Sequence, residues 1–304
     1  MFLDNYLAAR KHELAAGTHT LHKTTANYLK AFFKADLRID QITKQKARQF
    51  KTDLAGGLLS YVSKRPQELS QGTVDGHMRN ARTMFNFAIA DDMLPLNPFK
   101  HLCQTILVDK EWHYITADDY NKLVNASPAS WQLLFALCRL AGLRRSEALH
   151  LAWNNIDWEQ NTILVISKEN WKTKTRRSRK VPMCPELQSI LAAADPGNPV
   201  VAEVIIEGLS RNNLWRDFHK IRETAGINEY KKPFQVMRKS CAQDWADYNV
   251  PVNSLHIWMG HTKLETTMNY YLKASKLEYQ RAAETNFFKK ECANSVQKPI
   301  KDSS

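Results

Sequence analysis

The sequence has few cysteines and lacks the motifs of most nucleotide-dependent and metal-dependent enzymes. Its five cysteines are odd in number and form no CxxC pair, which argues against a disulfide framework and against structural zinc. No P-loop, GxGxxG, HExxH or GxSxG motif occurs, and no cluster of residues has metal-ligand spacing. The sequence therefore predicts an activity that needs no cofactor and no metal, in a reducing compartment.

Long apolar runs and a secretion signal are also missing. No run approaches the roughly 18 apolar residues of a membrane span, and the N-terminus lacks the basic and apolar regions of a signal peptide. The formal net charge is +12 and the pI is about 9.4, which favours a polyanionic partner. Nucleic acid is favoured over a membrane because no basic amphipathic membrane helix or lipidation motif is visible. We expect a cytoplasmic protein.

The length of 304 residues suggests two domains. Residues 1–105 are predicted to be mostly helical, with an interruption near Gly17 and a helix from Thr24 to Phe33. A longer helix is predicted after Ser70, because apolar residues recur there at helical spacing, namely Val74, Met78, Ala81, Phe85 and Ala88. Three polar residues lie off this stripe and are candidates to contact DNA, with an ordinary solvated face as the alternative: His77, Arg79 and Arg82.

Residues 106–115 are predicted to be a linker, because they show no sustained period. Residues 116–288 are predicted to form a second domain that ends in a helix, and residues 289–304 a polar tail. Within the second domain, the β-branched run from Thr162 to Ser167 predicts a strand, and Val181-Pro-Met closes a hairpin. The connection between these strands is rich in Lys and Arg. The fold expected is mainly α with a small β-hairpin or sheet.

A candidate site for phosphate chemistry lies in the second domain. Transfer of a phosphoryl group without metal requires cations and hydrogen-bond donors around the phosphorus, and Arg144 and Arg238 suit this because each offers a planar fork of donors. The stretch 233–248 is predicted to be one helix that carries Gln235 and Arg238 on the same face. His261 and Tyr270 follow on short helices. An arginine, a histidine and a tyrosine near each other indicate a site where a phosphate is bound and attacked.

These residues resemble the motifs of the tyrosine recombinases, the phage integrase family. The resemblance rests on Gly142-Leu-Arg144-Arg-Ser-Glu147, on Thr173-Lys174-Thr followed by Arg179-Lys-Val-Pro182, on Met237-Arg238, on Gly260-His261 and on Thr266-Thr-Met-Asn-Tyr270. In the first domain, Leu69-Ser-Gln-Gly-Thr73-Val and Asn97-Pro98-Phe resemble the helical core-binding domain of this family. The resemblance thus covers most of the chain.

The resemblance implies a two-domain clamp around double-stranded DNA and a site-specific recombinase or integrase of mobile elements. Arg144 and Arg238 would bind the scissile phosphate, and Tyr270 would attack it to give a 3′-phosphotyrosyl intermediate. Lys174 would protonate the leaving 5′ oxygen, His261 would bind a non-bridging oxygen, and Glu147 would support the site. Other basic residues of the hairpin would contact DNA phosphates or remain solvated: Lys168, Lys172, Arg176, Arg177 and Arg179.

The resemblance further implies a homo-tetramer on paired DNA sites, nucleoid association, and a possible directionality factor. Two other functions stay open. A type IB topoisomerase uses the same chemistry, and a catalytically weakened protein would bind a DNA sequence without cleaving it. The second alternative arises because Gln235 stands where the family usually has histidine. Glutamine can donate a hydrogen bond to a phosphate but cannot shuttle a proton near neutral pH.

Four assignments keep an alternative. Tyr271 competes with Tyr270, but a helix from Thr262 would place Leu264, Met268 and Tyr271 on the buried stripe and Tyr270 toward the site. Lys172 competes with Lys174 as the hairpin lysine. His256 is expected to be a surface or packing residue. The segment after Tyr270 docks either on a neighbouring subunit or on its own.

Overall fold

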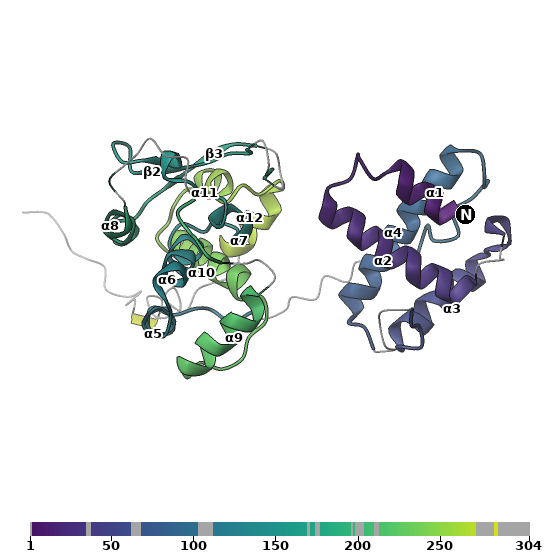
Figure 1. The fold of residues 1–304 in the computed structure, drawn as a ribbon, viewed down its shortest axis with the longest axis horizontal. Coiled ribbons are helices and arrows are strands. Elements are labelled where there is room, and N and C mark those ends of the chain that lie inside the picture. The colour runs from purple at the N-terminus through teal and green to yellow at the C-terminus, as the bar shows by residue number, and fades with distance from the viewer. Residues whose placement is uncertain are drawn as a thin grey trace, which may run out of the picture. The chain divides into compact units, whose positions relative to one another are not determined.

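The computed structural model describes residues 2–34, 38–61, 68–102, 112–168, 171–173, 177–195, 197, 204–209, 213–271 and 283–284. Two compact units, 1–110 and 111–304, each have a hydrophobic core (Figure 1). The described residues are mainly helical, with one small sheet in the second unit, which confirms the predicted fold class. Lys174, Arg176, most of the predicted linker and most of the segment after Tyr271 lie outside the described residues. None of the described helices is long and apolar enough to cross a membrane.

The first unit is a group of helices around α4. In order, the elements are α1 (Phe2–Ala9), α2 (Ala16–Phe33), η1 (Ile39–Gln41), α3 (Lys44–Ala55) and α4 (Gln71–Ala90). All five apolar positions predicted for the long helix are buried, so that stripe is confirmed. The predicted interruption near Gly17 is wrong, because α2 begins at Ala16 and the break lies before it. Gly17 is tolerated because it stands in the first turn of the helix.

His77 does not face solvent, so its assignment as a DNA contact is wrong. Its ring is 7% exposed, its Nδ1 lies 2.8 Å from Thr25 Oγ1, and it packs edge-on against Tyr28. The reason is that α4 packs against α2 as well as α3, so its buried face is wider than one apolar stripe. Arg79 is exposed and Arg82 is half-buried, so both remain candidates for DNA contact.

The second unit contains eight described α-helices and a small antiparallel sheet. The elements are α5 (Ala117–Asn125), α6 (Ala129–Arg139), α7 (Arg145–Ala148), η2 (Trp153–Asn155), β1 (Ile156–Asp157), β2 (Thr162–Val165), β3 (Arg179–Pro182), α8 (Pro185–Ala194), α9 (Leu214–Thr224), α10 (Pro233–Asp247), α11 (Val252–Met259) and α12 (Leu264–Tyr271). The strand order is β1-β2-β3. In the predicted hairpin, Val165 pairs with Arg179 and Ile163 with Val181.

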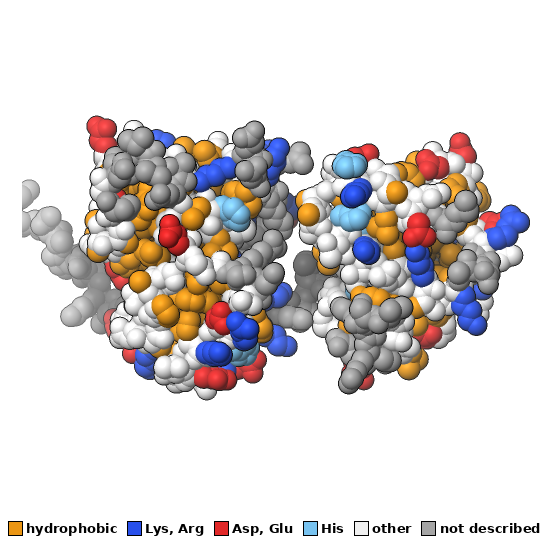
Figure 2. All heavy atoms as spheres, in the orientation of Figure 1, with side chains coloured by type: hydrophobic (Ala, Val, Ile, Leu, Met, Phe, Trp, Pro, Cys, Tyr) orange, Lys and Arg blue, Asp and Glu red, His pale blue; other side chains and the backbone are white. Residues whose placement is uncertain are grey.

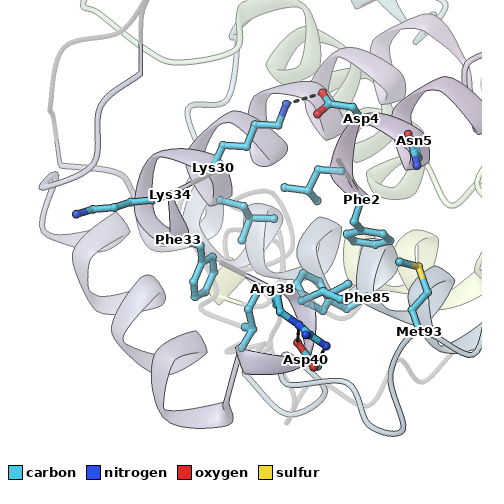
Figure 3. A pocket seen from close by; sticks show the side chains of 14 residues that line it. Phe2, Asp4, Asn5, Lys30, Phe33, Lys34, Arg38, Asp40, Phe85 and Met93 are labelled. Atoms are coloured by element: carbon cyan, nitrogen blue, oxygen red, sulfur yellow. Dashed lines mark hydrogen bonds and ion pairs between the residues drawn. The ribbon is translucent and has the colours of Figure 1, made fainter. Parts of the chain in front are cut away.

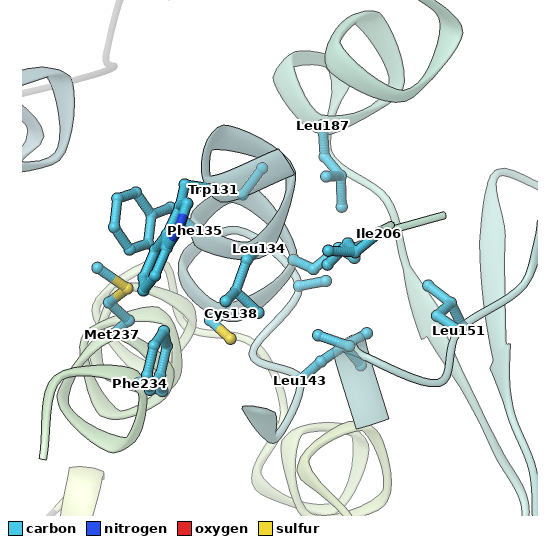
Figure 4. Packing of buried hydrophobic residues seen from close by; sticks show 14 of the residues in the cluster. Trp131, Leu134, Phe135, Cys138, Leu143, Leu151, Leu187, Ile206, Phe234 and Met237 are labelled. Carbon is cyan, nitrogen blue, oxygen red and sulfur yellow. The ribbon is translucent and has the colours of Figure 1, made fainter. Parts of the chain in front are cut away.

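The core of the second unit fixes the position of α10, which carries Gln235 and Arg238. Figure 4 shows Trp131 and Phe135 of α6 packed beside Phe234 and Met237 of α10. These side chains are at most 7% exposed, and buried aromatic residues contribute much of the packing energy of a core. Because one face of α10 packs in this core, the helix cannot rotate, and this fixes the direction in which Arg238 extends from the adjoining face.

Polar contacts tie the start of the second unit to the same helix. Arg139 donates through Nε and Nη2 to the carbonyl of Ile115, at 3.2 and 3.0 Å, and its Nη1 binds the Asp244 carboxylate. Tyr114 also donates to Asp244, and the Ile115 amide donates to Ser240 Oγ at 2.9 Å. Asp244 and Ser240 belong to α10, so the chain that enters this unit is anchored to the helix that carries Arg238.

The main pocket of the described residues lies away from the candidate site. The pocket in Figure 3 belongs to the first unit, where apolar side chains such as Phe33 and Phe85 lie beside the ion pair of Lys30 with Asp4. It contains none of the candidate catalytic residues. On the face shown in Figure 2, the described Lys and Arg side chains form small separate groups. The candidate site is defined by contacts among its side chains.

Candidate active site

The last turn of α11 brings three arginines together. Three successive carbonyls accept one guanidinium each: Trp258 from Arg179 Nε at 2.8 Å, Met259 from Arg238 Nη2, and Gly260 from Arg144 Nη2 at 2.8 Å. The last carbonyls of a helix lack partners within the helix and carry the negative end of its dipole. A helix C-terminus is therefore a favourable place for cations. Arg238 belongs to α10, Arg179 to β3, and Arg144 directly precedes α7. These segments are far apart in the sequence and lie around α11 in Figure 1.

Glu147 lies beneath the arginines and is 2% exposed. Its carboxylate accepts hydrogen bonds from Arg179 Nη2 at 2.6 Å and Nη1 at 3.1 Å, from Arg144 Nη1 at 2.8 Å, and from the Arg144 amide at 2.9 Å. Arg238 Nη1 lies 4.0 Å away. Burial raises the pKa of Glu147, but the hydrogen bonds and charge of Arg179, with Arg144, outweigh it and lower the pKa to about 2. Glu147 is therefore ionised at neutral pH.

Arg238 is nearly buried but keeps its charge. Its Nη1 donates to the carbonyl of Gly142 at 2.5 Å, and its side chain is 9% exposed. Burial, and then the nearby Arg144, lower the pKa of Arg238, while Glu147 raises it. Guanidinium groups remain protonated in proteins. The buried carboxylate of Glu147 thus allows the guanidinium groups of Arg144 and Arg238 to lie close to one another.

Two glycines are required for this packing. Gly142 has φ +60°, and a Cβ there would lie 3.0 Å from Met259 Sδ. Gly260 has φ +57°, and a Cβ there would lie 3.0 Å from Arg179 Cδ. Side chains rarely adopt this left-handed region, and here they would also displace Met259 or Arg179. These glycines therefore allow the close approach of α11 to the arginines.

His261 and Tyr270 lie next to the arginine group. Their rings are stacked, with 6.4 Å between centroids and an interplanar angle of 11°. Burial, then Arg238 and Arg144, lower the pKa of His261 to about 4, so the ring is neutral at pH 7. Burial raises the pKa of Tyr270, while Arg238 lowers it. The net effect raises the pKa of Tyr270, so its hydroxyl is protonated in the free protein, and the charge of Arg238 opposes this shift.

The two adjacent tyrosines differ in what their hydroxyls contact. The Tyr271 hydroxyl donates to the carbonyl of Val250, whereas the Tyr270 ring lies against His261. The predicted buried stripe of this helix is wrong, because Leu264 is exposed and Thr267 is fully buried instead. The stripe was drawn from apolar residues alone, while the buried position is held by a threonine whose hydroxyl binds histidines.

The remaining candidate residues divide by exposure. Gln235 is exposed in the first turn of α10, one turn before Arg238. Lys172 and Arg177 are exposed, and Lys168 is half-buried, so that burial lowers its pKa.

Arg179 is buried between Glu147 and Trp258, so its assignment as a DNA contact is wrong. Period-two alternation in β3 was the available signal, since Arg179 shares the inward face with buried Val181.

No group of His, Cys, Asp and Glu in the described ranges has an arrangement that could hold a metal ion. The site instead contains the cationic guanidinium groups of the arginines and the neutral imidazole of His261. This arrangement can bind a tetrahedral or trigonal-bipyramidal phosphate and stabilise negative charge on its non-bridging oxygens. The tyrosine beside it can serve as a nucleophile. The geometry is therefore suited to phosphoryl transfer through a covalent intermediate.

Comparisons with known proteins match both units of the chain. Residues 113–277 match the Phage integrase family, and residues 1–106 match the phage integrase SAM-like domain. Tyrosine recombinase XerC of Chlamydia muridarum is 23% identical over 230 residues, which is 69% of this chain and 70% of that protein. The tyrosine recombinase XerC-like protein of Caldanaerobacter subterraneus subsp. tengcongensis is 23% identical over 263 residues, or 72% of this chain and 66% of that protein.

Solved structures show the same fold. The Tn1549 transposon integrase in complex with transposon right end DNA superposes with a TM-score of 0.68 at 18% identity, over 93% of this chain and 98% of that one. A lambda integrase dimer bound to a COC′ core site gives a TM-score of 0.69 at 16% identity, over 89% of this chain and 94% of that one. At such identities the likeness establishes the arrangement of the chain, and the chemistry rests on the residues described above.

Proposed function

The chain belongs to the phage integrase family, the tyrosine recombinases, and on this premise we propose that it is a site-specific DNA recombinase. It cleaves and rejoins double-stranded DNA through a 3′-phosphotyrosyl intermediate, without metal or ATP. The observation that carries the proposal is the meeting of Arg144, Arg238 and His261 at the end of α11, beside Tyr270. This set holds a phosphate and a nucleophile together.

The proposed reaction exchanges one phosphodiester bond for another. Tyr270 Oη attacks the scissile phosphorus, the Oη–P bond forms, and the bond from phosphorus to the 5′ oxygen breaks. The proton lost by Tyr270 passes to a base or solvent, and a second proton reaches the 5′ oxygen from Lys174, with Lys172 as the alternative donor. Because the phosphotyrosyl bond conserves the energy of the broken bond, a second 5′ hydroxyl can reverse the step without ATP.

The arginines retain donors for this phosphate. Arg144 and Arg238 each offer five N–H groups, of which the contacts described above occupy two on each side chain. The others can bind the non-bridging oxygens, where negative charge increases in the transition state. His261 donates to one of these oxygens. Glu147 touches no phosphate in this scheme and acts by keeping Arg144 in place.

DNA binding outside the site is proposed for basic residues on both units, which would close around the duplex as a helical core-binding domain and a catalytic domain. The candidates are Arg79, Arg82, Lys168, Lys172, Arg176 and Arg177. Contacts with phosphates give affinity that falls as salt rises, independent of sequence. We further propose a homo-tetramer on two paired sites, a directionality factor as an additional partner, and action in the cytoplasm at the nucleoid. The segment after Tyr271 would dock between subunits or on its own subunit.

Formation of a covalent adduct tests this function. A nicked duplex that carries a selected binding site releases a short 5′-hydroxyl strand when it is cleaved, so that the cleaved strand cannot be religated. The duplex is incubated with wild-type protein in EDTA, which removes free metal ions. We expect an adduct that survives SDS, disappears with protease, and is attached to the 3′ phosphate. Recombination between two such sites, rather than relaxation of a single-site supercoiled plasmid, separates a recombinase from a topoisomerase. Tight binding without any adduct would contradict the proposal and favour a binding protein.

Gln235→His is expected to change the cleavage rate by less than roughly tenfold, since both side chains donate an N–H to a phosphate oxygen. Gln235→Ala removes the donor, and we expect a loss on the order of 10²-fold. Single-turnover cleavage of the nicked duplex from pH 5.5 to 8.5 measures both. A rise of more than a hundredfold in Gln235→His, with a new ionisation near the ordinary pKa of histidine, would instead show that this position is a general base.

A further inference from the structure

A buried hydroxyl links two histidines behind the candidate site. Thr267 of α12 is 0% exposed. Its Oγ1 lies 2.9 Å from Nδ1 of His261 and 3.3 Å from Nδ1 of His256, one turn before the end of α11. The proposed chemistry uses neither Thr267 nor His256. The residue is fully enclosed, so it cannot touch DNA itself and can act only through the histidines.

The charge state of His261 makes the position of its proton important. Arg238, Arg144 and Arg179 are the cations around His261, and with burial they lower its pKa to about 4. The ring is therefore neutral at pH 7 and has a single N–H, on either Nδ1 or Nε2. A phosphate oxygen accepts hydrogen bonds but does not donate them. Only the tautomer with the proton on Nε2 can bind phosphate while Nδ1 faces Thr267.

We propose that Thr267, supported by His256, is a positioning residue that fixes this tautomer of His261. His256 donates from Nδ1–H to Thr267 Oγ1, and the hydroxyl proton of Thr267 is donated to Nδ1 of His261. The proton of His261 is thereby held on Nε2, which is turned to the phosphate. The last step rests on the proposed function, whereas the hydrogen-bond chain is a property of the free protein.

The hydroxyl has one proton, so it can donate to only one of the two histidine nitrogens. If it donates to one histidine nitrogen, it can only accept from the other. In the reverse direction, His261 would donate from Nδ1 to Thr267, and its Nε2 lone pair would face the phosphate oxygens. That arrangement repels the substrate instead of binding it. Orientation of a ligating histidine through its other nitrogen is a general device in protein sites.

Thr267→Val tests the proposal, because valine keeps the shape of threonine and removes the hydroxyl. The matched control is Thr266→Val at the neighbouring exposed position, and Thr267→Ser restores the hydroxyl. The ring nitrogens are observed by ¹⁵N NMR in histidine-labelled, DNA-free protein, with His261→Gln used only to assign the signals. We expect a protonated Nε2 in wild type, Thr266→Val and Thr267→Ser, and a mixture of tautomers in Thr267→Val.

Cleavage provides a second readout. We expect Thr267→Val to cleave the nicked duplex roughly tenfold more slowly, less than the loss on removing a donor outright, because the active tautomer is still partly populated. Its affinity for DNA should remain within about twofold of wild type, since Thr267 is buried. Thr267→Ser should recover most of the rate. A loss caused by general loosening of the fold would lower affinity and rate together and leave the tautomer unchanged.

Two results would overturn the inference. One is a wild-type spectrum in which His261 is protonated on Nδ1. The other is a Thr267→Val protein whose spectrum and cleavage rate equal those of Thr266→Val. Because the spectra need no DNA cleavage, they separate this inference from the proposed function. A wild-type protein with the expected tautomer and no adduct would refute the recombinase activity and leave the hydrogen-bond chain standing.

Discussion

Tyr270→Phe is expected to abolish the covalent adduct with DNA, while Tyr271→Phe retains it. Phenylalanine keeps the ring that stacks on His261 but lacks the oxygen that attacks phosphorus. No other group on this ring can take that role, so we expect a loss of at least roughly 10³-fold, to the background of the assay. The adduct on the nicked duplex, resolved by denaturing gel and mass spectrometry of the labelled peptide, measures this.

Tyr271→Phe is the matched control, because it removes the same atom one residue away. Its hydroxyl binds the carbonyl of Val250, so the expected cost is one hydrogen bond, about 1 kcal/mol of folding free energy. Both variants should bind the site with wild-type affinity. An adduct that is lost in Tyr271→Phe and kept in Tyr270→Phe would exchange the two assignments, and the contact with Val250 would then have to break on DNA binding.

Arg179→Met is expected to destabilise the second unit by roughly 3–5 kcal/mol and to suppress cleavage with it. Methionine fills much of the same space as arginine, but it leaves the Glu147 carboxylate, which belongs to a residue only 2% exposed, without its bidentate hydrogen bonds from Arg179. The carbonyl of Trp258 also loses its donor. Urea unfolding, followed by the fluorescence of tryptophan, measures the free energy at pH 7.

Acid should reduce the difference between Arg179→Met and wild type. In the native protein, Glu147 has a pKa of about 2, below its ordinary value of about 4.5, so its ionisation stabilises the fold above the higher value. This stabilisation is lost as pH falls through the lower value. Arg179→Met lacks most of this stabilisation. The difference in free energy of unfolding between wild type and the variant should therefore be largest at pH 7, and it should shrink between about pH 4.5 and pH 2 by on the order of 3 kcal/mol.

Arg177→Met is the control for the same hairpin. Arg177 is exposed, so its replacement should leave stability within about 0.5 kcal/mol and weaken DNA binding in a salt-dependent way. If Arg179→Met were as stable as Arg177→Met at pH 7, the buried pair with Glu147 would contribute nothing to the fold. The assignment of Arg179 as a DNA contact would then have to be restored.

Periodicity predicted the elements well where a single face is buried. The α4 stripe around Met78 and the helix at 233–248 follow the 3.6-residue repeat, and the hairpin follows β-branched residues and its turn. His77 was misplaced because α4 packs against two helices, and one-face reasoning takes only one neighbour into account. Arg179 was misplaced because charge was taken as a sign of exposure, although its alternation with Val181 indicated burial.

The site itself was only partly accessible from the sequence. The resemblance to the tyrosine recombinases indicated Arg144, Arg238, His261 and Tyr270, and the structure brings those side chains together. The α11 carbonyls could not be predicted, since every residue has a carbonyl and its partner depends on tertiary packing. The buried Thr267 was missed for a related reason, because a threonine beside polar residues indicates neither core nor hydrogen-bond chain.

The end of α11 has a consequence for how this protein can change over generations. Main-chain oxygens, rather than side chains, hold Arg144, Arg179 and Arg238 there. A substitution at position 258 or 259 therefore removes none of these hydrogen bonds directly, although Met259 is fully buried and its side chain is constrained by packing. A change in helix length is different, because each inserted or deleted residue rotates the helix end by about 100°. The hydrogen bonds to the arginines thus constrain the length of this helix, whereas the packing around Met259 and the left-handed Gly260 constrain its composition.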